Sequence, residues 1–219
     1  MLKKFFSVSI IKTFRLNYRY FGWGGVLHTY ILCSKHTLIK NLEGTVSLTR
    51  RERGIVRIGF GEVEVIDGKN NRAIWSNKGN ITFNGDAHFC QGAKIIVKEN
   101  ASITFGNHFI LNGDTQLIAR KSITFGDDCL LSWGGLIMDT DFHSIYAADD
   151  SQKKRTNKDR EVKIGDHCWL GCNVILTKGA SLAENTIVSA GSIVKKAHAT
   201  PNCVLVGDQE IKNSIDWHY

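Results

Sequence analysis

Between residues 162 and 196 an aliphatic residue recurs at every sixth position. The series consists of branched side chains: Ile164, Leu170, Leu176, Leu182, Val188 and Val194. Four residues after each of the first five comes a small or β-branched residue: Cys168, Val174, Ala180, Thr186 and Ser192. An amphipathic helix repeats every 3.6 residues and a two-faced strand every two, so neither keeps a six-residue step in phase. The pattern predicts hexapeptide repeats, in which three hexads complete one triangular coil of a parallel β-helix.

The same register returns upstream, in four copies of one unit. The copies begin at Ile81, Ile103, Ile123 and Val162, which lie 22, 20 and 39 residues apart. A coil of three hexads takes about 18 residues. The last gap therefore holds an extra loop near residues 143–163, which is polar and charged. Loops of this length in a compact domain are more often functional or disordered than filler.

The chain divides into one β-helix domain and two flanking segments. We expect the β-helix over residues 55–212, a C-terminal tail over residues 213–219 and an N-terminal leader over residues 1–54. The leader is basic and partly apolar, and we expect it to be helical up to the glycines at 22–25. Because Lys12, Arg15 and Arg19 interrupt it, no apolar run approaches the ~20 residues that cross a bilayer. We expect the leader to cap the open edge of the first coil, with contact to an anionic membrane surface as the alternative.

Composition narrows the class of protein. The six cysteines do not form metal-finger spacings, and several fall at inward positions of hexads, which indicates reduced, buried thiols in the cytoplasm. The net charge of +7 is compatible with nucleic acid, a membrane or a phosphorylated small molecule. No aromatic residues interleave with the basic ones, and no helix-turn-helix or zinc signature is present, so nucleic acid is disfavoured. A phosphate-bearing ligand fits the charge better.

Three segments carry a resemblance to a known family. The run "IGDHCWLGCNVILTKGASLAENTIVSAGSIVKK", the following "NCVLVGD" and the upstream "MDTDFHS" resemble the hexapeptide-repeat acyltransferases with a left-handed parallel β-helix. More narrowly, they resemble the bacterial O-acetyltransferases that modify sugars of capsule, lipopolysaccharide or other surface glycans. The resemblance implies a cytoplasmic homotrimer with active sites between subunits, acetyl-coenzyme A (acetyl-CoA) as donor, a sugar or glycan as acceptor and no metal. An enzyme of this kind would lie at the inner face of the membrane if its leader contacts lipid.

Acetyl transfer to a sugar hydroxyl needs a base, because a free alcohol is a weak nucleophile near neutral pH. His143, in "IMDTDFHSI", matches the histidine base of the family. Asp139 and Asp141 flank it, and either could hold the imidazole in the required tautomer. The alternative for both carboxylates is a solvated turn.

The coenzyme site is carried over from the family mainly as backbone positions. Gly171 and Cys172, in "WLGCN", match the position whose backbone faces the thioester and could supply an amide to the developing oxyanion. Ser189 and Ala190, in "VSAGS", match the next backbone contacts, one coil further along.

Three side chains complete the predicted site. Lys195 and Lys196 match the position that meets the nucleotide phosphates, and Trp169 matches an aromatic wall of the acceptor chamber, with a packing role as its alternative. The usual closing turn, Gly-x-Pro-Ala-Lys, is replaced by "VGDQEIK". The assignment of Lys212 to the coenzyme is therefore in doubt.

Three other functions are compatible with the same fold. An N-acetyltransferase acting on an amino sugar is the nearest alternative, because a hydroxyl and an amine place similar demands on the enzyme. A γ-class carbonic anhydrase would bind zinc through three histidines, but the residue five after His167 is Cys172, and His143 would have to be the distant ligand. A non-catalytic scaffold is the third alternative, although such a chain would be expected to have lost the histidine or the lysines.

Overall fold

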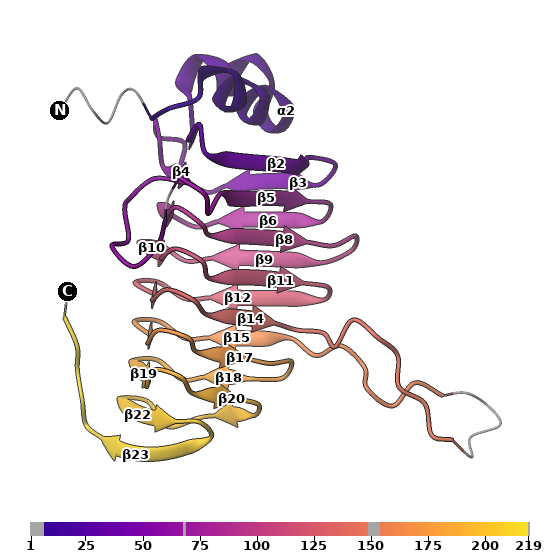
Figure 1. Cartoon of the computed structure of the whole chain (residues 1–219), viewed down its shortest axis with the longest axis vertical. Helices are drawn as coiled ribbons and strands as arrows, with labels where there is room; N and C mark the ends of the chain where they lie inside the picture. Colours follow the sequence, from indigo (N-terminus) through magenta and orange to yellow (C-terminus); the bar gives the residue numbers. More distant parts are fainter. Residues whose placement is uncertain (1–6, 68, 149–153, 219) are drawn as a thin grey trace.

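The computed structural model describes residues 7–67, 69–148 and 154–218. The described chain forms a prism of stacked coils with one helix across its N-terminal end (Figure 1). Three sheets form the walls of the prism, and each coil gives one strand to each sheet. The fold is the parallel β-helix that the repeats predicted, in the left-handed form that the family resemblance implied.

Strands within each sheet pair in parallel, except for the last strand of the first sheet. The first sheet contains β1 (Ile31–Cys33), β4 (Val56–Ile58), β7 (Ala87–Phe89), β10 (Phe109–Leu111), β13 (Leu130–Leu131), β16 (Trp169–Leu170), β19 (Thr186–Val188), β22 (Cys203–Val206) and the antiparallel β23 (Gln209–Asn213). The second contains β2 (Thr37–Asn41), β5 (Ala73–Asn77), β8 (Lys94–Val97), β11 (Gln116–Ala119), β14 (Leu136–Met138), β17 (Ile175–Leu176) and β20 (Ile193–Val194). The third contains β3 (Thr45–Leu48), β6 (Asn80–Phe83), β9 (Ser102–Phe105), β12 (Ser122–Phe125), β15 (Val162–Ile164), β18 (Ser181–Leu182) and β21 (Ala197–His198).

The four predicted copies occupy the same place in consecutive coils. Ile81 pairs with Ile103, Ile103 with Ile123 and Ile123 with Val162. A register that is set by identical inward residues buries the same face of every strand. The spacing read from the sequence thus corresponds to one coil per copy.

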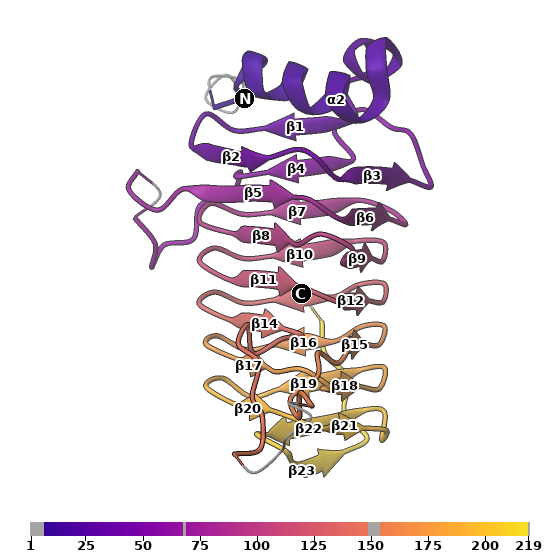
Figure 2. The same cartoon turned by 90° about the vertical axis from the view of Figure 1, so that its right-hand side faces the viewer.

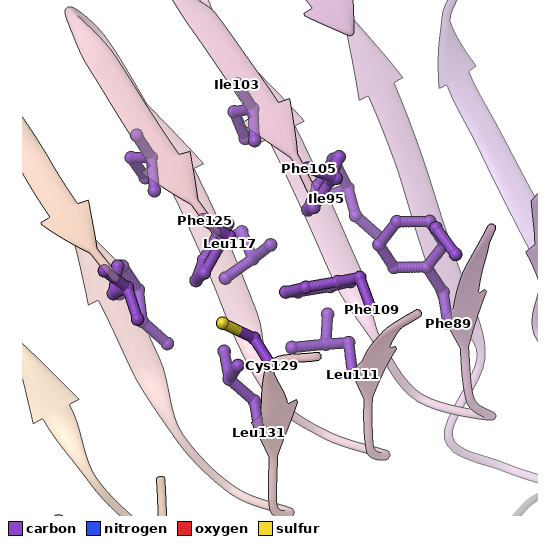
Figure 3. Close-up of a cluster of buried hydrophobic side chains, with 14 of the residues drawn as sticks. Phe89, Ile95, Ile103, Phe105, Phe109, Leu111, Leu117, Phe125, Cys129 and Leu131 are labelled. Atoms are coloured by element: carbon purple, nitrogen blue, oxygen red, sulfur yellow. The ribbon is translucent and has the colours of Figure 1, made fainter. Parts of the chain in front are cut away.

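The interior of the prism changes along its axis. In the middle coils phenylalanines stack on one another (Figure 3), and the parallel rings of Phe105 and Phe125 have centroids 5.7 Å apart. Such aromatic pairs contribute ~0.5–1.5 kcal/mol each beyond the area that they bury. In the C-terminal coils the six aliphatic residues of the regular hexads, from Ile164 to Val194, are all buried, as predicted.

The N-terminal end is closed by helix α2 (Ile10–His28). Ser9 caps it by accepting a hydrogen bond from the amide of Lys12. The helix extends beyond the expected break, because Gly22 adopts a φ of 63° and produces a kink, after which the helix continues to His28. Among the described residues, no helix is long and apolar enough to cross a membrane.

The side of α2 that faces the first coil contacts it through the fully buried Leu16 and through two polar side chains. Asn17 donates to the carbonyl of Ile31 (2.7 Å) and accepts from its amide (3.0 Å), and Thr13 bonds the amide (3.1 Å) and carbonyl (3.5 Å) of Cys33. These groups belong to β1, the first strand of its sheet, which would otherwise present an unpaired edge. Helix α2 therefore satisfies backbone groups of β1 through side-chain hydrogen bonds.

The β-helix begins earlier than the sequence pattern indicated. β1, β2 and β3 form a complete coil within residues 31–48, upstream of the expected start at residue 55. Its inward residues Cys33, Ile39 and Leu48 pair with Ile58, Trp75 and Phe83 of the next coil, but the second step between them is nine residues long instead of six. Thr37 takes the small-residue position opposite Ala73, where its hydroxyl bonds Ser34 (3.0 Å) and the carbonyl of Ile58 (3.2 Å). The six-residue aliphatic series does not reach this coil, so the repeat is hidden in the sequence.

Two excursions leave the coils. The larger runs from residue 139 to residue 161, between β14 and β15, and projects away from the prism (Figure 1). We call this segment the arm; its residues 149–153 lie outside the described part. The smaller excursion joins β4 to β5 and was not anticipated from the sequence.

Candidate active site at two corners of the C-terminal coils

The predicted site residues lie at opposite ends of the short strands β14, β17 and β20, which Figure 2 shows stacked in the lower half of the prism. The corner at which these strands begin is called the glycine corner and contains Gly171, Cys172, Ser189 and Ala190. The corner at which they end is called the lysine corner and contains the foot of the arm, Lys178, Lys195 and Lys196. Each corner is a column of turns, one turn per coil.

Asp139 fixes the point at which the arm leaves the coil. It is fully buried, and its two carboxylate oxygens accept the backbone amides of Arg120 and Lys121, both at 2.8 Å. Burial raises the pKa of the Asp139 carboxyl, and these amides oppose that rise. The structure gives Asp139 a bond to the turn of the preceding coil and none to His143.

Asp141 ties the arm to the next coil. Its carboxylate is bonded by the ammonium group of Lys178 and by the side-chain amide of Asn157 (2.8 Å). The hydrogen bond from Lys178, followed by that from Asn157, lowers the pKa of the Asp141 carboxyl. Asn157 also donates to the backbone carbonyl of His143 (2.7 Å), so Asp141 positions the backbone of His143 through Asn157.

His143 is exposed at the foot of the arm. Phe142, before it, has a positive φ of 61°, and the amide of His143 bonds the carbonyl of Asp141 (2.7 Å) in a tight turn. Within the described residues no side chain bonds the His143 imidazole. The role of His143 as base and the identity of the group that orients it stay predictions.

The sequence did not reveal Lys178 or the ion pairs behind it. Asp159 accepts from Arg155 and from the hydroxyl of Thr140, both at 2.8 Å, and these contacts join the two sides of the arm. A signal for Lys178 was present, because it lies one coil of 18 residues before Lys196 and so occupies the same position of the repeat.

A groove runs along the arm at the lysine corner, and most of its lining is cationic: Lys154, Arg155, Thr156, Asn157, Lys158, Arg160 and Lys178. Arg155 and Lys178 are partly neutralised by Asp159 and Asp141. The remaining positive charge fits an anionic ligand.

The glycine corner brings Gly171 and Ala190 into close contact. A Cβ atom on Gly171 would lie 2.7 Å from the Ala190 nitrogen, so only glycine fits there. The amide of Gly171 donates to Val188 (2.9 Å) and that of Ser189 to Leu205 (2.9 Å), so neither is free to bind an oxyanion. In the described part of the chain, the amides of Cys172 and Ala190 have no protein acceptor.

Trp169 lies on the outward side of β16, next to the glycine corner. Its indole N–H donates to the hydroxyl of Ser132 (3.1 Å), and its ring lies 5.9 Å from that of Trp217. Trp217 belongs to the tail, is buried and stacks on His167 at 4.5 Å. The sequence predicted a tail but not its return to this surface, because no repeat links Trp217 to His167.

Lys195 and Lys196 are exposed, directly after β20. Their backbone amides bond the carboxylate of Asp208, with the Lys195 contact at 3.0 Å, and His198 bonds the same carboxylate at 3.1 Å. Burial would raise the pKa of the Asp208 carboxyl, but these hydrogen bonds outweigh it and the pKa is lowered. The turn is thus held by Asp208, while both ammonium groups extend from it.

Across residues 7–67, 69–148 and 154–218, no three His, Cys, Asp or Glu side chains form a group that could hold a metal ion. His167, the histidine at the carbonic-anhydrase position, bonds the carbonyl of Trp217 (3.0 Å) instead.

Comparison with known proteins places the chain near glycan acetyltransferases. It is 40% identical over 68 residues to a polysialic acid O-acetyltransferase of Neisseria meningitidis, which covers 31% of each protein. It is 27% identical over 124 residues to a galactoside O-acetyltransferase of Escherichia coli, covering 54% of this chain and 59% of that protein. The chain thus spans less than two thirds of these relatives. No family model matches it.

Two longer alignments extend this picture. A 24.8 kDa protein from the cps region of Klebsiella pneumoniae is 26% identical over 191 residues, covering 86% of this chain and 82% of that protein. The crystal structure of the polysialic-acid-specific acetyltransferase NeuO superposes with a TM-score of 0.62 at 18% identity, covering 86% of this chain and 84% of that one, which shows the shared fold. These similarities confirm the resemblance to hexapeptide-repeat surface-glycan acetyltransferases and support the expected class of enzyme, an acyltransferase.

Proposed function

We propose that the chain is an acetyl-CoA-dependent O-acetyltransferase that modifies a sugar hydroxyl of a bacterial surface polysaccharide or its precursor. The observation that carries the proposal is the pairing of an exposed histidine without a side-chain partner, at the foot of the arm, with exposed lysines in the same column of turns. The names of the curated relatives, which act on polysialic acid and galactosides, support a glycan acceptor.

In this proposal His143 is the general base. Its imidazole takes the proton of the acceptor hydroxyl while the hydroxyl oxygen attacks the thioester carbonyl carbon. The tetrahedral intermediate then breaks its carbon–sulfur bond, and the departing thiolate receives the proton from the imidazolium. The overall reaction consumes acetyl-CoA and an alcohol and yields an acetyl ester and coenzyme A.

The glycine corner supplies hydrogen-bond donors. The free amides of Cys172 and Ala190 replace the engaged amide of Gly171 as candidate donors to the oxyanion and the pantetheine carbonyls. Gly171 then has a different role, which is to let the two turns approach closely. Trp169, held by Ser132, walls the acceptor chamber.

The separation of the two corners favours a site between subunits. Six residues from one corner to the next span up to about 20 Å, which is too far for a base and a thioester held at different corners of one chain. A neighbouring subunit would bring its own glycine corner to His143. The exposed apolar side chains of the arm, Phe142, Ile145 and Tyr146, provide a surface for that contact, and we propose a homotrimer.

We place the reaction in the cytoplasm. All six cysteines are free, and five are buried, as expected for reduced thiols. Burial raises the pKa of the Cys33 and Cys90 thiols to about 11, so both are protonated and unreactive at neutral pH.

The test is mass spectrometry of surface glycans from cells with and without the gene. We expect a mass difference of one acetyl group, removed by mild base because it is an ester. Complementation with the full chain should restore the group, whereas the His143→Ala variant should not. An acetyl group that resists mild base would indicate an amide and establish N-acetylation of an amino sugar instead.

A further inference from the structure

Helix α2 leaves one apolar side exposed, while its buried side combines Leu16 with polar residues. Thr13 and Asn17 face the first coil, while the exposed large apolar residues of the helix are Ile10, Ile11, Phe14, Tyr18, Trp23 and Leu27. The side chains of Ile10 and Leu27 are 83% and 80% exposed. A surface helix of a globular domain normally turns its apolar side to the core. An apolar side that stays exposed in this way indicates that it has another partner.

The apolar residues form one stripe. At 100° per residue, Ile10, Ile11, Phe14 and Tyr18 fall within about 100° of the helix circumference. Phe14, Tyr18 and Trp23 lie against one another at the surface, with ring centroids 5.3–6.2 Å apart. Aromatic side chains of this kind are enriched where protein meets the boundary between lipid and water.

A groove with one cationic wall lies beside the stripe. It runs between α2 and the outward face of β1, β4 and β7, where Leu32, Arg57 and His88 stand in register. Ile11 and Phe14 line the helix side, and Arg53 and Arg57 are among the residues that line the sheet side. Apolar and cationic groups therefore meet along the same groove.

The charge of the chain is concentrated at this end. Residues 7–57 contain nine Lys and Arg and two Glu, a net charge of +7, whereas residues 58–219 contain 17 Lys and Arg and 19 Asp and Glu, a net charge of −2. The positive balance thus does not extend over the coils that carry the candidate site. The positively charged N-terminal end complements an anionic surface.

We propose that α2 and the groove beside it bind the surface of an anionic phospholipid bilayer. The helix lies in the plane of the interface, with Ile11 and Phe14 among the acyl chains and Arg53 and Arg57 against lipid phosphates. This contact rests on the N-terminal end alone and does not depend on acetyl transfer.

The experiment is co-sedimentation of the full chain with vesicles of phosphatidylglycerol and, separately, of phosphatidylcholine. We expect binding to phosphatidylglycerol that weakens at high salt, and little binding to phosphatidylcholine. The double variant Ile11→Gln/Phe14→Gln should bind at least about tenfold more weakly. Arg53→Ala/Arg57→Ala should bind about tenfold to thirtyfold more weakly, because each basic residue near the surface contributes roughly a fivefold factor.

Matched controls separate this contact from nonspecific adhesion. Ile211→Gln removes an exposed aliphatic side chain at the opposite end, and Arg72→Ala/Lys98→Ala removes the same charge elsewhere; both should bind like the wild type. Circular dichroism and acetyl transfer to a soluble acceptor should be unchanged in every variant. Equal binding to both lipids, or equal losses in the controls, would overturn the proposal. The proposal would also be overturned if the wild-type protein did not bind vesicles and instead formed an oligomer whose size Ile11→Gln/Phe14→Gln halved. In that case a second copy of the chain would cover the stripe.

Discussion

The two ends of the β-helix are closed by different devices. At the N-terminal end Thr13 and Asn17 of α2 bond the backbone of Ile31 and Cys33 in β1. At the C-terminal end β23 pairs antiparallel with β22, and the following tail carries Trp217 back to His167. At the N-terminal end an apolar surface of α2 stays exposed. At the C-terminal end Lys195, Lys196 and Trp169 stay exposed, as do backbone amides that have no protein acceptor in the described part of the chain.

This difference separates two kinds of task within one repeating fold. Each coil contacts only its neighbours, so a change at one end is not transmitted through the core to the other. The N-terminal end can therefore serve stability and docking, while the turns of the C-terminal coils are free to carry chemistry. The following substitutions test whether the two ends are in fact independent.

The largest effect is expected at His143. His143→Ala should lower kcat by at least about 100-fold, the usual contribution of a general base, with no change in oligomeric state or coenzyme binding. Steady-state kinetics measures kcat and the KM for acetyl-CoA, and sedimentation measures the oligomeric state. His36→Ala, an exposed histidine at the N-terminal end, is the control and should retain full activity. A loss smaller than about tenfold at His143 would remove its assignment as the base.

The next effect concerns the lysines after β20. Changing both Lys195 and Lys196 to Ala should raise the KM for acetyl-CoA between about tenfold and a thousandfold, because each charge-assisted contact contributes ~1–3 kcal/mol before salt screening. The KM for the acceptor should hardly change, and the effect should shrink at high salt. Acetyl-pantetheine, which lacks the nucleotide phosphates, is the control donor. Equal weakening of both donors would show that the lysines act through folding or assembly.

The N-terminal cap is tested by Asn17→Ala. This change leaves the buried amide and carbonyl of Ile31 without their partner, and we expect a loss of about 2–4 kcal/mol in the free energy of unfolding, because each unsatisfied group costs ~1–3 kcal/mol. Urea denaturation measures it. Arg15→Ala, exposed on the same helix, should change stability by less than about 0.5 kcal/mol. If the ends are independent, the KM for acetyl-CoA stays unchanged in both variants.

The smallest effect is expected at Asp208. Because the folded protein lowers the pKa of this carboxyl, its stabilising contribution is present above the ordinary carboxyl pKa and is lost as the pH falls through the lowered value. Asp208→Asn should therefore cost about 1 kcal/mol at pH 7, and the difference from wild type should disappear as the pH falls from the ordinary carboxyl pKa of about 3.9 through the lowered pKa of the folded protein. Urea denaturation at several pH values measures this. A constant difference at every pH would show that the carboxylate charge is not involved.

The regular hexads could be read from sequence because each inward position needs an aliphatic residue at the same step. Ile164 and Leu176 are buried where the pattern placed them. The first coil escaped notice because its inward residues Cys33, Ile39 and Leu48 are six and nine residues apart, so no constant six-residue step connects them.

The candidate site likewise contains features that the sequence could predict and features that it could not. The place of Lys195 and Gly171 at turns follows from the repeat, whereas their assignment to the coenzyme comes from the family resemblance and stays a prediction. The contacts of Asp141 with Lys178 and Asn157 could not be predicted, because they depend on how an irregular arm folds back on its own base. The engagement of the Gly171 amide by Val188 likewise follows from the stacking of coils, which the sequence alone does not display.

The stacking of coils also makes the prism a spacer of defined length. Five steps along the first sheet lead from β1 to β16, and at about 4.8 Å per step they separate the helix end from Trp169 by roughly 24 Å. An enzyme docked by α2 with the prism axis along the membrane normal would hold its reaction chamber at about that height above the lipid headgroups. A glycan attached to the same membrane would then be modified only at sugars that extend to this height. Deleting one whole coil would shift the modified position toward the anchor by about 4.8 Å, roughly the length of one sugar unit.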